Sequence, residues 1–106
     1  MIGYSNLLRR SPVSVSTTPV KLFDPPALNR LGWRVFIPTS LAGSVGVRFL
    51  VRPPGGSAPT FSELTSAGSF RAEAGFLVQD AARSGLEVWV VVESGSVTLV
   101  PEEVMP

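Results

Sequence analysis

The sequence contains neither cysteine nor histidine among its 106 residues. Without cysteine the chain forms no disulfide and has no thiolate nucleophile. Without histidine it lacks the commonest metal ligand and the side chain best suited to proton transfer near neutral pH. This chain therefore has no zinc site and no catalytic triad that uses a cysteine or a histidine of its own.

Charged residues are also scarce. They make up 16% of the chain, and nine basic residues against eight acidic ones give a net charge of +1. No block of like charge occurs, so the sequence predicts no nucleic-acid-binding surface. Eight of the nine basic residues are arginine. This bias is compatible with ion pairing at an interface, and equally with the codon usage of a GC-rich genome.

Long apolar runs are missing as well. No run approaches the ~20 residues that a membrane helix needs, so we expect no membrane partner. Residues 1–10 carry their two arginines after their apolar residues, which is not the arrangement of a secretory signal. We therefore expect a soluble protein that is made in the cytoplasm of a cell.

Apolar side chains, by contrast, are abundant. They account for 44% of the residues, and the mean hydropathy is +0.31. This fraction is high for one small domain, because a small domain exposes much of its surface. Obligate subunit interfaces resemble a core cut in half, so we expect the excess at contacts between copies. The length predicts one domain, and the composition predicts an oligomer.

The clearest strand pattern lies in residues 85–100. Leu86, Val88, Val90 and Val92 alternate with Glu87, Trp89, Val91 and Glu93. This period of two, with many β-branched residues, predicts a largely buried strand. Ser94-Gly95 then separates it from a second apolar run and suits a tight turn with positive φ. The pattern predicts a central β-hairpin.

Shorter alternating segments recur about every ten residues, with Gly, Pro and Ser between them. Besides the hairpin, strands are predicted at residues 13–16, 20–23, 33–37, 44–52, 69–71 and 74–80. About seven or eight antiparallel strands predict an all-β domain, a small sandwich or jelly-roll-like barrel, over residues 13–106. Residues 1–12 are predicted to be an extended N-terminal arm.

Three segments are predicted to lie outside the strands. Residues 27–32 are expected to form a loop with at most one helical turn, and residues 101–106 are expected to leave the sheet. Residues 53–68 form a long excursion that begins with Pro53-Pro54-Gly55-Gly56. Long loops in small domains often make contacts. Phe61 and Leu64 indicate that part of this one packs onto the domain.

The remaining side chains predict little chemistry. Eight carboxylates are spread along the chain without a spacing that selects a glycosidase pair or a calcium site, so we expect them to be solvated. Trp33 and Trp89 each lie in a strand pattern, which favours packing in a core or interface over stacking against a sugar. The sequence predicts no cofactor, no metal site and no enzymatic activity.

Two parts of the sequence resemble small β-sandwich proteins of tailed-bacteriophage virions. Residues 13–22 have the pattern V-x-V-x-T-T-x-x-x-L, and the strand that begins at Asn29-Arg30 follows them. Residues 75–78 and 85–99, ahead of the acidic pair Glu102-Glu103, are similar to the closing hairpin of that group. The resemblance implies a capsid decoration (cement) or head-fibre protein. Such a protein occurs in the virion, commonly as a homotrimer.

On this hypothesis, the arm and the proline-rich loop contact the major capsid protein, another virion protein or a neighbouring copy. The expected partner-binding residues are Ile2, Tyr4, Leu7, Leu8, Arg9, Arg10, Pro53, Pro54 and Phe61. The arginines are expected to pair with acidic groups on the partner. The alternative hypothesis is a ligand-binding or carbohydrate-binding β-sandwich, such as part of a host-recognition fibre, which exposed Trp33 or Trp89 would favour.

Overall fold

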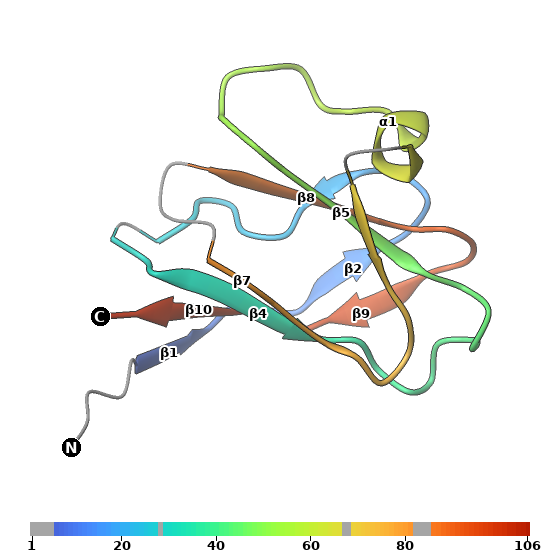
Figure 1. The fold of residues 1–106 in the computed structure, drawn as a ribbon, viewed down its shortest axis with the longest axis horizontal. Coiled ribbons are helices and arrows are strands. Elements are labelled where there is room, and N and C mark those ends of the chain that lie inside the picture. The colour runs from blue at the N-terminus through green and yellow to red at the C-terminus, as the bar shows by residue number, and fades with distance from the viewer. Residues whose placement is uncertain (1–5, 28, 67–68, 82–85) are drawn as a thin grey trace.

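The computed structural model describes residues 6–106, except for residues 28, 67–68 and 82–85. The described chain forms ten β-strands and one short helix (Figure 1). In chain order they are β1 (Asn6–Arg9), β2 (Val13–Val15), β3 (Val20–Lys21), β4 (Gly32–Phe36), β5 (Val47–Arg52), α1 (Phe61–Thr65), β6 (Phe70–Ala72), β7 (Leu77–Asp80), β8 (Glu87–Val92), β9 (Val97–Leu99) and β10 (Glu102–Met105).

These strands pair antiparallel throughout and form three sheets. Two sheets have four strands each, in the orders β1-β10-β4-β7 and β3-β8-β5-β6, and the third joins β2 to β9. The prediction of an all-β, antiparallel protein is confirmed.

The strand pairs nest within one another along the chain. The N-terminal strands β1 and β2 pair with the C-terminal strands β10 and β9, β3 pairs with β8, β4 with β7, and β5 with β6. Lateral pairing of β10 with β4 and of β8 with β5 then completes the two four-stranded sheets. The finer assignment to a jelly-roll sandwich stays a prediction.

The ladder between the two chain ends contains a one-residue bulge. Arg9 lies opposite Glu102, whereas Val13 lies opposite Leu99, so residues 10–12 face only residues 100–101. A bulge of this kind inserts one extra residue into a strand and bends it. Pro12 lies in the bulge, where its missing N–H interrupts no ladder bond.

The C-terminal segment corrects one prediction. Residues 101–106 do not leave the sheet, because β10 lies between β1 and β4. The ladder continues past Pro101, whose carbonyl accepts a hydrogen bond from the N–H of Arg10 at 2.9 Å. The same ladder makes residues 6–9 of the predicted arm an edge strand.

The predicted hairpin is correct in its first strand and its turn, and wrong in its pairing. All six residues of β8 are buried, and Gly95 has a φ of 75° in the turn that follows. However, β8 pairs with β3 on one side and β5 on the other. Its backbone groups are therefore already used, and β9 pairs with β2 instead.

The long excursion after β5 contains a helix that the sequence analysis treats as loop. Thr60 caps α1: its side chain accepts from the N–H of Glu63, whose carboxylate accepts in return from the N–H of Thr60. This reciprocal capping box satisfies two backbone donors at the start of the helix. Leu64 is fully buried against Trp89 and Val91 of β8, which confirms that this part packs onto the domain.

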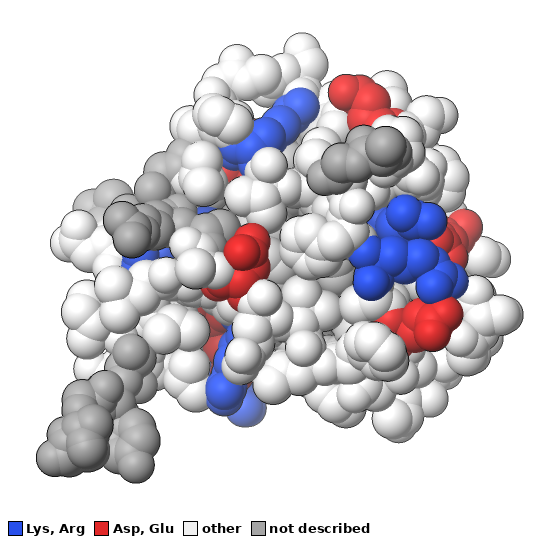
Figure 2. All heavy atoms as spheres, in the orientation of Figure 1, with Lys and Arg blue, Asp and Glu red and all other residues white. Residues whose placement is uncertain are grey.

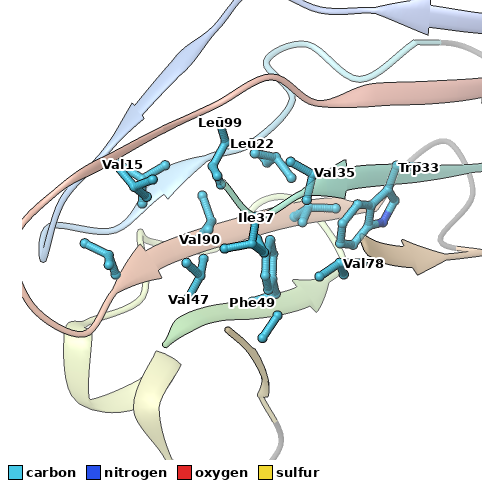
Figure 3. Close-up of a cluster of buried hydrophobic side chains, with 14 of the residues drawn as sticks. Val15, Leu22, Trp33, Val35, Ile37, Val47, Phe49, Val78, Val90 and Leu99 are labelled. Atoms are coloured by element: carbon cyan, nitrogen blue, oxygen red, sulfur yellow. The ribbon is translucent and has the colours of Figure 1, made fainter. Parts of the chain in front are cut away.

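The main hydrophobic core lies between the two four-stranded sheets (Figure 3). Trp33, Val35 and Ile37 project into it from β4 and the residue that follows β4, and Val47 and Phe49 project into it from β5. These are the faces that the alternating sequence predicts to be buried. The opposite residues of the same strands therefore form the outer surfaces of the domain.

Candidate functional site

The predicted partner-binding residues of the arm lie mostly on the edge strand β1. Leu7 and Leu8 are 45% and 43% exposed on opposite sides of this strand. Arg9 is largely exposed, and its Nη2 atom lies 3.5 Å from the Glu102 carboxylate. Ile2 and Tyr4 lie outside the described residues. The described part of the arm thus presents apolar side chains at a sheet edge.

Arg10 has a different environment from the one predicted for it. Its guanidinium donates to the carboxylate of Glu103 and, at 2.7 Å, to the carbonyl oxygen of Pro25. Glu103 is completely buried and also accepts from Arg30 at 2.9 Å and from the N–H of Ala27 at 2.8 Å. The acidic partner of Arg10 is therefore inside the chain, and this cluster fastens the arm to the domain.

The proline-rich loop lies apart from the arm. Pro53 and Pro54 are exposed, and Phe61, the first residue of α1, is 36% exposed. Figure 1 shows this loop and α1 on the side of the molecule opposite β1. The structure therefore does not bring the two predicted contact regions together into one surface.

One uncovered sheet surface extends well beyond the predicted contact residues and shares only Leu7 and Arg9 with them. It is the solvent side of the β1-β10-β4-β7 sheet, which we call the outer face. Its residues alternate with inward-facing positions along the four strands and include Val100 just before β10; they are Leu7, Arg9, Gly32, Arg34, Phe36, Leu77, Gln79, Val100, Glu102 and Val104. Phe36 and Leu77 are 50% and 52% exposed, which shows that no described element covers them.

Strand register arranges the outer face in three rows across the sheet. One apolar row contains Phe36, Leu77 and Val100; the middle row contains Arg9, Glu102, Arg34 and Gln79; the third row contains Leu7, Val104 and Gly32. Val100 follows β9 and lines the same shallow hollow as Phe36 and Leu77. The outer face thus has a charged strip between two apolar strips.

The charged row is held together by Glu102. Its carboxylate accepts from Nε of Arg34 at 2.8 Å, and this hydrogen bond, together with the nearby charge of Arg9, keeps the pKa of Glu102 below its ordinary value. Burial opposes this shift only in part. The carboxylate is therefore ionised near neutral pH, and the row alternates positive, negative and positive across three strands.

Gly32, in the third row, lies close against the backbone of Asp80. A Cβ atom at this position would lie 2.4 Å from the carbonyl oxygen of Asp80, so a larger residue would force β4 away from the end of β7. The backbone of glycine is what permits this close approach. Leu31, Arg34 and Val104 line a shallow hollow beside Gly32.

The solvent side of the other sheet is partly covered by α1 and carries paired charges. Glu87 accepts from the indole N–H of Trp89 at 3.0 Å, and Lys21 lies 3.2 Å from the same carboxylate. The Trp89 hydrogen bond is the main reason that the pKa of Glu87 lies below its ordinary value. Figure 2 likewise shows basic and acidic side chains next to each other on the visible face.

Both tryptophans are packed inside the protein. Trp33 is fully buried and Trp89 is 8% exposed. The strand patterns around both residues predict this packing, and the structure confirms it. A sugar-stacking platform needs an exposed aromatic face, which neither residue provides, so this feature of the ligand-binding alternative is absent.

The prediction that the carboxylates are solvated is wrong for several of them. Glu103 and Glu87 are buried rather than solvated, and Glu93 and Glu102 are half-buried in ion pairs. All arginines in the described part of the chain form ion pairs within it. Ion pairing is thus one use of the arginine excess. The described residues contain no cluster of acidic side chains that could hold a metal ion.

The ionisation of Glu93 makes the free energy of unfolding depend on pH. It accepts from Arg71, Arg48 and the N–H of Gly46, and these contacts, Arg71 first, lower the pKa of Glu93 from 4.5 to about 2. A lowered folded-state pKa contributes stability that is complete above about pH 4.5 and is lost as the pH falls towards 2.

We therefore expect Glu93→Gln to unfold more easily than the wild type near neutral pH, with a difference that shrinks on acidification. Urea unfolding of both proteins at several pH values between about 6 and 2.5 measures this. A difference that stays constant over this range would contradict the lowered pKa of Glu93.

Comparisons with known proteins give no relative of this chain: no protein-family model, curated protein or solved structure matches it. Among the described residues, no helix has the length and apolar character required to cross a membrane.

Proposed function

We propose that this chain is a non-enzymatic structural protein of a phage virion, a decoration protein that attaches to the capsid as a homo-oligomer. The observation that carries the proposal is the outer face, where two apolar rows of a rigid sheet lie uncovered. Large exposed apolar patches on a soluble domain are typical of contact with another protein. The resemblance of residues 13–37 and 75–103 to small virion proteins supplies the biological setting.

The strand order supports the same proposal. If β1–β2 and β9–β10 are each counted as one interrupted strand, eight strands pair in the nested order first with eighth, second with seventh, third with sixth and fourth with fifth. An antiparallel ribbon folded in this way is a jelly roll, an architecture used by viral capsid and lectin domains. This argument is an analogy at the level of the fold.

Particle contacts are assigned to the edge strand β1 and to the loop that precedes α1. Leu8 is exposed at the sheet edge, and Pro53, Pro54 and Phe61 are exposed on the opposite side of the molecule. An unpaired strand edge offers backbone hydrogen bonds to a partner strand. The two regions give the protein two separate places at which other virion proteins can bind.

Virions of the phage that encodes this chain provide the direct test. Mass spectrometry of gradient-purified particles is expected to find the chain at a fixed ratio to the major capsid protein. Detection in the infected-cell lysate but not in the particles would overturn the proposal.

Leu8→Ser tests the contact itself. The side chain is exposed, so we expect the fold to persist while particle binding weakens about tenfold or more, as measured by co-sedimentation. Deletion of residues 1–12 is a poorer test, because it also removes Arg10 from the buried Glu103 cluster. Phe76→Ser, at another exposed apolar residue, is the control.

A further inference from the structure

The outer face is complementary to itself. Its middle row alternates in charge, with Arg9 and Arg34 on either side of Glu102. Consider a two-fold axis in the plane of the face that runs parallel to the strands, between β10 and β4. Rotation about this axis places β10 of one copy over β4 of the other. Glu102 of each copy then faces Arg34 of the other, and both ion pairs are attractive.

The apolar rows match under the same operation. Because Phe36 and Val100 occupy one row on either side of the axis, Phe36 of one copy meets Val100 of the other. In the third row, Val104 of each copy meets Gly32 of the other, beside the shallow hollow that Leu31 helps to line. Each of these contacts occurs twice, once on either side of the axis, as an isologous interface requires.

The size of the face agrees with a dimer interface. Four strands about 4.8 Å apart and three rows about 7 Å apart make a surface roughly 20 Å on a side. With the side chains at its margin, this approaches the ~600–800 Å² per partner that specific interfaces bury. Four of its apolar side chains, Leu7, Phe36, Leu77 and Val100, are 40–52% exposed and form the apolar part of such an interface.

We propose that two copies of this chain pair through their outer faces about this two-fold axis. The occupant of the face is thus a second copy of the chain. The pairing rests on the outer face alone and does not depend on a virion role. It yields a dimer, whereas the resemblance implies a trimer.

Light scattering at concentrations between about 1 and 100 μM tests the pairing, because interfaces of this size dissociate in or below this range. We expect a mass of twice 11.2 kDa. Phe36→Ser is expected to weaken the dimer about 10-fold to 100-fold without unfolding the domain, since half of this side chain is exposed. Phe76→Ser, at an exposed residue outside the outer face, is the matched control and should leave the dimer unchanged.

A charge exchange tests the axis. Glu102→Arg alone places two arginines opposite each other at each contact, and Arg34→Glu alone places two glutamates there, so each variant should be monomeric. Mixed together, they restore both opposite-charge pairs and should form a dimer. Circular dichroism shows whether each variant is folded. If either is unfolded, the effect of Phe36→Ser on the mass decides whether the two copies pair through the outer face.

A wild-type monomer at all concentrations, a trimer, or a dimer that survives Phe36→Ser would overturn the pairing. The presence of the chain in particles is measured separately, so none of these results decides whether the chain is a virion protein, although a monomer would also contradict the homo-oligomer of the proposed function. Conversely, a dimer of a protein that is absent from virions would support the pairing alone.

Discussion

Glu103→Gln is expected to destabilise the protein by about 3–5 kcal/mol, the usual cost of breaking a buried ion pair. The carboxylate is completely buried. The groups that contact it, which are Arg10, Arg30 and the N–H of Ala27, all donate hydrogen bonds to it. A carboxylate only accepts hydrogen bonds, whereas a glutamine amide would turn its own donor group towards one of these donors. The substitution therefore removes the charge and creates a donor–donor conflict.

Urea unfolding measures this loss, with Glu73→Gln as the control. The Glu73 side chain is 42% exposed and forms a surface ion pair with Arg71, so its replacement should cost no more than about 1 kcal/mol. Equal losses for the two variants would show that the Glu103 cluster does not hold the arm and β10 together. A domain of this size is stable by only about 5–15 kcal/mol, so the expected difference is easily resolved.

The same cluster explains why the sequence does not predict β10. Strand prediction relies on apolar residues at every second position, and in β10 the residue that points inward is Glu103. Its charge is compensated by Arg10 and Arg30, which lie far away in the sequence. A pattern confined to one segment contains no information about such distant partners.

Alternation predicts β4, β5 and β8 well, because each has an apolar inward face that its own residues reveal. It gives the face of a strand but not its neighbour, so the pairing of β9 with β2 was not predictable from residues 85–100. The outer face, apart from Leu7 and Arg9, was missed for the same reason. Phe36 and Leu77 are isolated apolar residues in the sequence and become adjacent only when β4 pairs with β7.

Trp33 lies at the centre of the core, and Trp33→Ala is expected to cost about 3–5 kcal/mol. Its ring lies 5.9 Å from that of Phe23, 5.7 Å from that of Phe49 and 6.2 Å from that of Phe70, measured between centroids. Truncation leaves a cavity between β4 and the rings of Phe49 and Phe70 on the facing sheet, which the packed strands cannot close. Thermal and urea unfolding should both record the loss.

Two further variants separate packing from other roles of Trp33. Trp33→Phe keeps an aromatic ring, and the only polar group that it removes is an indole N–H that has no hydrogen-bond partner among the described residues. We therefore expect Trp33→Phe to lose less than half as much stability as Trp33→Ala. Phe76→Ala removes a ring that is 57% exposed and should cost less than about 1 kcal/mol. If Trp33→Ala were as stable as Phe76→Ala, the two sheets would not enclose the common core on which the outer face depends.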